Sequence, residues 1–358
     1  MRSKKVLILY TGGTFGMVQV GPGKLGTTSP LRISDQSPSD LRRWFHKRVP
    51  ELPEIAQCDV EIPLNRDSAH VGPEEWVMLA KRIQLAWKHY DGVVVLHGTD
   101  TLAYTASALS FLLRPCKKPV VITGAQRPLS ALRTDARRNL IASVEIAATA
   151  SEAPDPRVAR GVSVFFDHLL FQGNRVRKRS ASEFRGFESP KFPPLAEIGT
   201  EIRYLLPGQD EGKWPRSEKL KLQPAFNEKI VHLCVTPAFP ARRLLDLVSG
   251  SLDGVLLQIF PSGTAPTHLP GLMEFLASAG RRKIPVVLVA EGHSIQEQGG
   301  AHPQTYAAGL PLIENGGIWA GGMTSECAFV KMSLLLAQPD GKRQFAKYWK
   351  MDLAGEGG

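Results

Sequence analysis

Two short motifs in the first 101 residues carry side chains that could perform nucleophilic chemistry. Thr11-Gly12-Gly13-Thr14 follows one apolar run, and His97-Gly98-Thr99-Asp100-Thr101 follows another. Glycines permit a tight turn, which would leave the hydroxyl of Thr14 at the edge of a sheet. The second motif would place hydroxyls and a carboxylate at a helix N-terminus, where backbone N–H groups can hold a developing oxyanion. Two such turns on neighbouring strands favour a catalytic site over two unrelated structural turns.

Each motif taken alone also has a structural interpretation. Gly12 and Gly13 can form a plain turn, and Thr99 with Asp100 can cap a helix. A nucleotide-binding loop is disfavoured because neither Gly-x-Gly-x-x-Gly nor Gly-Lys-Ser/Thr follows these glycines. His97 suits a buried strand end better than a catalytic base, since no Ser or Cys nucleophile is marked as its partner. The motifs become informative only as a pair.

Both motifs lie where apolar, β-rich runs give way to turns and helical segments, which is the pattern of a parallel sheet. Such runs occur at 6–10, 92–96, 119–123 and 162–166, and helical periodicity at 73–89 and 101–113. Thr101 is placed to cap the second helix. Ligands of such sheets bind outside the carboxyl ends of the strands, so we expect the two motifs to meet there.

The chain predicts two α/β domains. Prolines and polar residues between 190 and 227 indicate an interdomain linker. Apolar runs then resume at 230–236, 254–260 and 285–290, with helices expected near 242–249 and 269–279 and a closing helix at 325–337. We therefore predict a larger, flavodoxin-like N-terminal parallel-sheet domain (1–206), a linker (207–228) and a smaller Rossmann-like C-terminal domain (229–358).

Composition limits the class of protein. The 358 residues are 43% hydrophobic and 22% charged, as in ordinary globular proteins. The net charge of +10 is spread over short basic groups without one dominant tract, which favours a solvated basic surface over a nucleic-acid site. The first apolar run is too short for a membrane span or a secretory core. We therefore expect neither nucleic-acid nor membrane partners. Four scattered cysteines suit a reducing compartment, so we expect a cytoplasmic protein.

The paired motifs resemble the two signatures of the L-asparaginase/glutaminase family. The resemblance covers essentially the whole chain. Within the family, the chain is similar to the cytoplasmic type I branch. It extends through 67–68 with 73–76, 103–109, 123–128, 173–175 with Lys178, and 189–190. It implies hydrolysis of L-asparagine to L-aspartate and ammonia, with side activity on L-glutamine, in a homodimer or homotetramer. Neither a metal nor an organic cofactor is expected, because no set of His, Cys and carboxylate residues has ligand spacing.

The resemblance implies a catalytic role for four residues. Thr14 matches the family's nucleophile, and Thr99, Asp100 and Lys178 match the group that activates the attack. A lysine can act as a base when burial and neighbouring cations lower its pKa, and a hydroxyl relay from Lys178 through Thr99 is then reasonable. The alternative for Lys178 is a surface lysine in a basic loop.

The resemblance also implies the substrate contacts. Ser68 matches the serine that binds the α-carboxylate, and Asp100 matches the residue that pairs with the α-ammonium. Asp67 belongs to the same turn, either as the residue that supports Ser68 or as a further substrate contact. One methylene separates asparagine from glutamine and is worth only ~1–3 kcal/mol of discrimination.

The sequence also departs from the family pattern. Phe15 replaces an aliphatic residue, and the segment 15–32 has no tyrosine to close over the nucleophile, with Leu25 near the expected place. Ala69 follows Ser68 where a polar residue often assists binding, and Gln258 stands where some type I enzymes carry an arginine of an allosteric site. These departures leave two alternatives open. One is a non-catalytic amino-acid sensor, and the other is a related amidohydrolase or amidotransferase subunit with another substrate.

Overall fold

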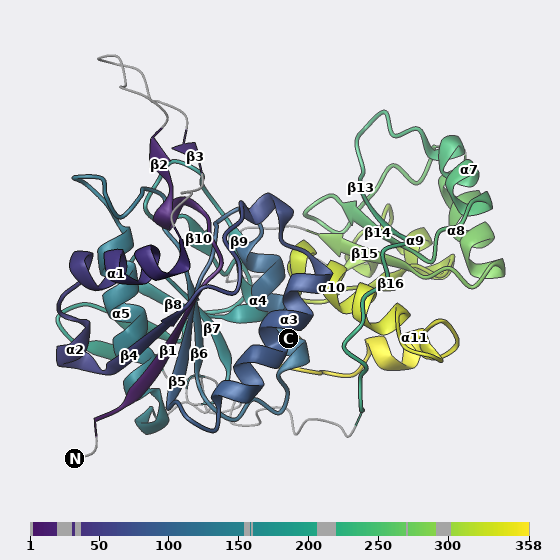
Figure 1. Ribbon diagram of the computed structural model, residues 1–358. Helices are drawn as coiled ribbons and strands as arrows, with labels where there is room; N and C mark the ends of the chain where they lie inside the picture. The colour runs from purple at the N-terminus through teal and green to yellow at the C-terminus, as the bar shows by residue number, and fades with distance from the viewer. Residues whose placement is uncertain are drawn as a thin grey trace. The chain divides into compact units, whose positions relative to one another are not determined.

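The computed structural model describes residues 3–19, 31–32, 37–153, 158, 160–205, 220–269, 271–290 and 302–357. The chain forms two compact units, of residues 1–189 with 194–214 and of residues 190–193 with 215–358. Each unit is built on its own sheet and helices (Figure 1), which confirms the predicted fold class of two α/β domains. The predicted linker 207–228 lies in large part outside the described residues and stays a prediction.

The sheet of the first unit has the strand order β12-β11-β8-β7-β6-β5-β1-β4. Its parallel part comprises β4 (Gln57–Glu61), β1 (Lys5–Tyr10), β5 (Gly92–Leu96), β6 (Val120–Thr123) and β7 (Val162–Phe166). The chain runs from β1 to β4 on one side and then crosses to β5 on the other side of β1. The winding therefore switches direction at β1, and the carboxyl ends of β1 and β5 border the crevice in which such sheets bind ligands.

Three antiparallel strands extend this sheet and were not predicted. They are β8 (Leu169–Gln172), β11 (Ala196–Ile198) and β12 (Ile202–Tyr204). β7 and β8 form a hairpin through Asp167, whose φ is +61°. The predicted parallel sheet is present, and these strands extend it at one edge. A linker starting at residue 190 was wrong, because β11 and β12 belong to the first unit. The prolines there precede β11 instead of interrupting it, and β11 completes its backbone hydrogen bonds by pairing with β8.

Helices cover both faces of this sheet (Figure 1). α3 (Pro73–Ala86) and α4 (Leu102–Leu112) lie on one face, while α1 (Pro38–Arg48), α2 (Leu52–Ile55) and α5 (Ala136–Thr149) lie on the other. Alternate strand residues such as Leu7 and Val93 point to the α3–α4 face, where they pack fully buried against Leu79 and Leu109. Each buried leucine contributes ~1.5–3 kcal/mol, so this layer anchors the strand ends that carry the motifs.

Among its described residues, the second unit has four parallel strands in sequential order. They are β13 (Ile230–Cys234), β14 (Gly254–Ile259), β15 (Val286–Ala290) and β16 (Ile318–Trp319). Its helices are α7 (Leu244–Ser249), α8 (Leu272–Arg281), α9 (Leu310–Glu314), α10 (Ser325–Leu336) and α11 (Gly341–Trp349). The first three strands and α7, α8 and α10 match the predicted segments. The prediction that α10 closes the chain was wrong, because α11 follows it and packs on it.

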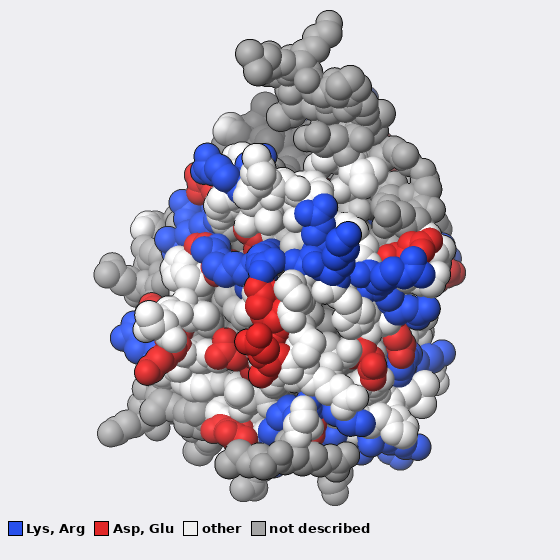
Figure 2. Space-filling view, turned by 60° about the vertical axis from the view of Figure 1, so that its left-hand side comes forward, with Lys and Arg blue, Asp and Glu red and all other residues white. Residues whose placement is uncertain are grey.

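Basic side chains form a band across one face of the molecule, with acidic side chains beside it (Figure 2). Several exposed arginines of the first unit are paired with carboxylates, including Arg137 with Glu51 and Arg138 with Asp167.

Within the described part of the chain, no helix is both long and apolar enough to cross a membrane.

Candidate active site

The first motif leaves β1 in a backbone conformation that glycine adopts easily and other residues do not. Gly12 has φ +113° and Gly13 has φ +77°. The N–H of Gly13 donates to the carbonyl of Arg66 at 3.1 Å, which holds the turn beside the loop after β4. Thr14 then opens the short 3₁₀ turn Thr14–Gly16 and remains partly exposed. The turn therefore presents Thr14 at the carboxyl end of the sheet.

The two motifs pack backbone against backbone, and the Ser68 side chain packs against the backbone of the second motif. A Cβ atom on Gly13 would lie 2.3 Å from the Cα atom of Gly98, and a Cβ atom on Gly98 would lie 2.6 Å from the Oγ atom of Ser68. Both distances are shorter than any tolerated carbon contact, so the close approach requires glycine. Three turns that follow different strands thus meet at one edge of the sheet.

Thr101 connects two of these turns through a hydrogen bond that the sequence did not predict. It occupies the N-cap position of α4, but its side chain makes no capping hydrogen bond. Its hydroxyl instead donates to the carbonyl of Ser68 at 2.7 Å. The predicted helix start is correct and the predicted cap is wrong, because the hydroxyl is oriented to donate to the neighbouring turn and accepts no N–H of α4.

Lys178 connects the second motif to a distant part of the chain. Its Nζ atom donates to Thr99 Oγ1 at 2.7 Å and to Asp100 Oδ1 at 2.6 Å. The Lys178 side chain is 20% exposed and that of Asp100 is 65% exposed, while Thr99 is buried. A lysine held in this way is not the freely solvated surface lysine of the structural alternative. The structure therefore brings together three of the four residues assigned to catalysis.

The short hairpin of β9 (Arg177–Lys178) and β10 (Phe187–Glu188) positions Lys178. Arg177 pairs with Glu188 at 2.8 Å across this hairpin, so part of the positive charge beside Lys178 is balanced. The Gln126 side chain donates to the carbonyl of Ser180 at 2.8 Å and links the hairpin to the loop after β6. Gln126 lies in 123–128, one of the segments that resemble the family, but the sequence did not predict this hydrogen bond to the hairpin.

Ser68 and Asp67 have different roles in their turn. The carboxylate of Asp67 accepts from the N–H of Ala69 at 2.9 Å and caps the 3₁₀ turn Ser68–His70. Asp67 is thus the turn-forming residue that its position suggested. Ser68 is 3% exposed, and its hydroxyl has no protein partner among the residues that the structure describes. That hydroxyl is available to a ligand.

His97 lies at the end of β5 and is completely buried. Its Nδ1 atom is 2.7 Å from the carbonyl oxygen of Gly98, and its Nε2 atom is 3.0 Å from Thr105 Oγ1. Burial lowers the pKa of His97 to about 4, although its hydrogen bond to Gly98 acts in the opposite direction. The imidazole is therefore neutral at pH 7, in agreement with the interpretation as a buried strand-end residue.

The region expected to form a lid is described only at its edges. Phe15 is buried and stacks on Phe45 with ring centroids 5.6 Å apart, so its departure from the family pattern is accommodated in the core. β2 (Val18–Gln19) pairs with β3 (Leu31–Arg32), and Leu25 lies outside the described residues.

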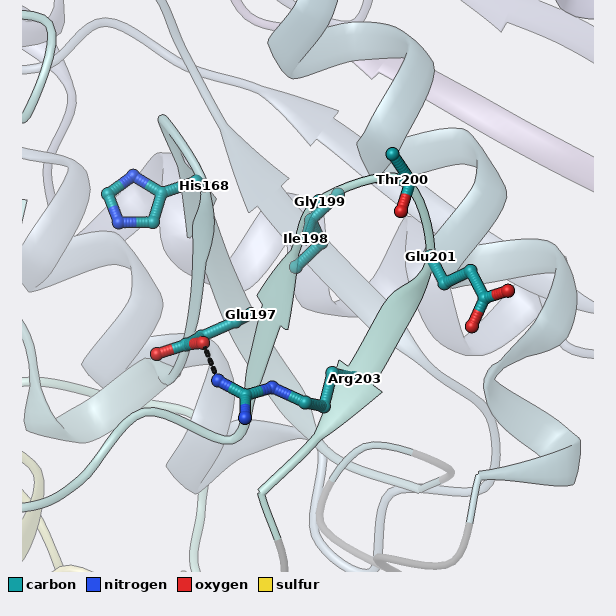
Figure 3. Close-up of a pocket in the computed structure, with 7 residues that line it drawn as sticks. All are labelled: His168, Glu197, Ile198, Gly199, Thr200, Glu201 and Arg203. Carbon is teal, nitrogen blue, oxygen red and sulfur yellow. Dashed lines mark hydrogen bonds and ion pairs between the residues drawn. The ribbon is translucent and has the colours of Figure 1, made fainter.

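A surface pocket of about 390 Å³ lies elsewhere, between the β7–β8 and β11–β12 hairpins (Figure 3). His168, Glu197 and Arg203 line it, and Glu197 pairs with Arg203 across the two strands. None of the residues predicted for the site lines this pocket. In the described ranges, no cluster of three or more His, Cys, Asp or Glu residues could hold a metal ion.

Comparisons with known proteins give the same family for both units. Residues 5–208 match the model of the N-terminal asparaginase domain, and residues 229–349 match that of the glutaminase/asparaginase C-terminal domain. The chain is 34% identical to L-asparaginase 1 of Escherichia coli, over 99% of this chain and 98% of that protein. It is 31% identical to a glutamyl-tRNA(Gln) amidotransferase subunit of Pyrococcus abyssi, over 98% of this chain and 76% of that protein. The crystal structure of L-asparaginase I from Vibrio cholerae superposes with a TM-score of 0.81 at 31% identity, over 99% of both chains.

Proposed function

Because this chain belongs to the asparaginase/glutaminase family, we propose that it hydrolyses L-asparagine to L-aspartate and ammonia, with Thr14 as the nucleophile. The observation that carries the proposal is the pair of hydrogen bonds from Lys178 to Thr99 and Asp100, at 2.7 and 2.6 Å. Hydrolysis of an amide requires a nucleophile, a proton acceptor and donors for the oxyanion. Each requirement has a candidate at the carboxyl edge of the first sheet.

The proton path follows from these contacts. In its neutral form, Lys178 accepts the hydroxyl proton of Thr99, whose oxygen takes a proton from Thr14 as Thr14 attacks the amide carbon. The resulting ammonium group returns this proton to the departing nitrogen, which leaves as ammonia. Water, deprotonated by the same route, then hydrolyses the ester on Thr14 and releases L-aspartate.

The remaining groups supply the oxyanion donors and the substrate contacts. The backbone N–H groups of Thr14 and Thr99 have no acceptor among the described residues and are the proposed oxyanion donors. The free hydroxyl of Ser68 would bind the α-carboxylate. Asp100 is more than half exposed and engages Lys178 through Oδ1, which leaves Oδ2 for the α-ammonium.

The decisive experiment measures ammonia release from L-asparagine and L-glutamine. We expect Thr14→Ala and Lys178→Ala to lower kcat by ~10³-fold or more, with melting temperatures close to that of the wild type. Thr14→Ser is the matched control, because it keeps a hydroxyl and should retain part of the activity. If folded wild-type protein binds L-aspartate but releases no ammonia, the proposal is wrong and the sensor alternative stands.

The relationship to an amidotransferase component supports a second candidate, in which ammonia is made for a partner protein. A protein of that kind would release little ammonia from L-asparagine alone and more when the partner is added. Steady release by the isolated chain favours the asparaginase. The ratio of kcat/KM for L-asparagine and L-glutamine then identifies the preferred amide.

Assembly, location and cofactors remain part of the proposal. We propose a homodimer or homotetramer, which light scattering on the purified chain would measure. A cytoplasmic location agrees with the four free cysteines, because thiols persist in a reducing compartment. A chelator should leave the activity unchanged, since the proposed steps require neither a metal ion nor an organic cofactor.

A further inference from the structure

A buried chain of hydrogen bonds ends at the second motif and takes no part in the proposed proton path. It starts at Trp76 in α3, whose Nε1 atom is 3.0 Å from Thr105 Oγ1 in α4. The same Thr105 oxygen is 3.0 Å from His97 Nε2, and His97 Nδ1 is 2.7 Å from the carbonyl oxygen of Gly98. All three side chains are buried, with at most 5% exposure.

The protons in this chain of hydrogen bonds have one consistent arrangement. The Gly98 carbonyl only accepts, so His97 must carry a proton on Nδ1. The ring is neutral because it is completely buried, and Nε2 therefore accepts a proton from the hydroxyl of Thr105. The indole of Trp76 only donates, and Thr105 Oγ1 is its acceptor. Every donation thus runs in one direction, from Trp76 to Gly98.

This arrangement fixes the peptide that joins Gly98 to Thr99. A peptide unit is planar and trans, so its C=O and N–H point in opposite directions. Because His97 holds the carbonyl of Gly98 on its own side, the N–H of Thr99 is turned away from the imidazole. Thr99 is buried, and this N–H has no acceptor among the described residues. Such a donor is ready for a ligand.

We propose that His97 is a positioning residue that aims the N–H of Thr99 at the oxyanion, and that Trp76 and Thr105 hold His97 in the required tautomer. The effect on rate rests on the proposed amide hydrolysis, whereas the proton arrangement does not. The neutral imidazole contributes a fixed direction to the backbone and no proton to the reaction.

Two variants of His97 separate positioning from general stability. Asparagine places an amide N–H near the position of Nδ1 and can keep the hydrogen bond to Gly98, while glutamine reaches the position of Nε2 and loses it. We expect His97→Gln to lower kcat for L-asparagine by ~10²-fold with KM within ~3-fold, and His97→Asn to stay within ~10-fold of the wild type. Equal kcat values for the two folded variants would overturn the positioning role.

Thr105 offers a second matched pair. Thr105→Val keeps the side-chain shape but removes the hydroxyl, so His97 Nε2 loses its donor and the ring can change its tautomer. Thr105→Ser restores the hydroxyl and should recover kcat to within ~3-fold of the wild type. If the Thr105→Val protein is folded and has the same kcat as Thr105→Ser, the proposed chain of hydrogen bonds is wrong.

The wild-type protein provides a test that depends on neither folding of a variant nor activity. NMR spectra of protein labelled with ¹⁵N-histidine distinguish the tautomers, and we expect His97 to be neutral with the proton on Nδ1 from pH 5.5 to 8. A proton on Nε2, or a charged ring at pH 7, overturns the inference. If the wild type releases no ammonia, the proposed function fails separately. The amide resonance of Thr99, shifted in His97→Gln and not in His97→Asn, then decides whether His97 directs this N–H.

Discussion

Two lysines of this protein, one in each unit, both donate to a carboxylate, but their surroundings differ. Lys331 in α10 uses its three N–H groups on Glu356 at 2.7 Å and on the carbonyls of Trp349 and Met351 at 2.9 and 2.7 Å. Lys331 and Glu356 are at most 2% exposed. Lys178 has two acceptors among the described residues, one of them a hydroxyl, and its carboxylate partner is mostly exposed.

The difference separates an ammonium whose three donors all have buried partners from one whose donors are only partly used. An ammonium with three N–H donors and three fixed acceptors cannot lose a proton without leaving a buried carboxylate unpaired. Lys178 keeps one donor free of protein partners among the described residues and contacts a hydroxyl that can pass a proton onward. The same pair of residue types therefore holds the fold together in one unit and belongs to the proposed active site in the other.

The largest expected effect is on activity, when the lysine in the site is changed. Lys178→Met should lower kcat by ~10³-fold or more while the free energy of unfolding changes by less than ~1 kcal/mol, because only a partly exposed ion pair is lost. Lys178→Arg is the control, since it keeps the charge beside Asp100 but cannot act as a base at neutral pH. Recovery of activity in Lys178→Arg would mean that charge alone is required.

The next effect is on stability, when the buried lysine is changed. Lys331→Met should lower the free energy of unfolding by ~3–5 kcal/mol, because Glu356 stays buried without its partner. The kcat of the folded fraction should remain within ~2-fold. Adding Glu356→Gln removes the unpaired charge and keeps an acceptor for the N–H of Leu353, so part of the loss should be recovered in urea titrations. No recovery would show that the charge itself is not the cause.

A smaller effect concerns the carboxyl group beside this pair. Burial raises the pKa of Asp352 to about 6, and the negative charge of Glu356 adds to the rise. The folded state therefore binds more protons than the unfolded state between pH ~4 and ~6, so the contribution of Asp352 to stability is lost as the pH rises through that window. Asp352→Asn should raise the free energy of unfolding by ~1 kcal/mol at pH 7, after allowance for its partial exposure, and by only ~0.2 kcal/mol at pH 4. An equal gain at both pH values would exclude titration as the cause.

The smallest effect belongs to an ion pair outside both environments. Arg43 and Asp40 on α1 are 3.3 Å apart, with side chains 80% and 50% exposed. Arg43→Ala should change the free energy of unfolding by ~0.3 kcal/mol or less, because water and salt screen the pair. A larger change would indicate that exposure is a poor guide to the strength of such pairs here.

The sequence predicted those parts of the fold in which local pattern and burial agree. The apolar runs became β1, β5, β6 and β7 with nearly the expected bounds, because buried parallel strands need continuous apolar residues. The β7–β8 hairpin was missed because its turn, Asp167-His168, contains no glycine, although aspartate tolerates a positive φ. β11 and β12 were missed because they are short and lie among prolines.

The candidate site was predictable through resemblance more than through chemistry. Lys178 is 79 residues from Thr99, so sequence spacing alone cannot bring the two together. The hydrogen-bond chain from Trp76 through Thr105 to His97 was not predicted. In the sequence, Trp76 and Thr105 look like ordinary core positions of a helix. Their contacts depend on how α3 and α4 pack on β5.

The backbone contact between Gly13 and Gly98 has a consequence for directed evolution of this protein. A library that randomises either codon should contain many variants that fold poorly, because a Cβ atom on Gly13 would overlap Gly98 and a Cβ atom on Gly98 would overlap the Ser68 side chain. Ala69 is exposed and follows Ser68 directly, so a larger side chain there can extend into solvent beside the proposed carboxylate contact. Screens for altered amide selectivity should therefore spend their diversity on Ala69 and leave the glycine turns unchanged.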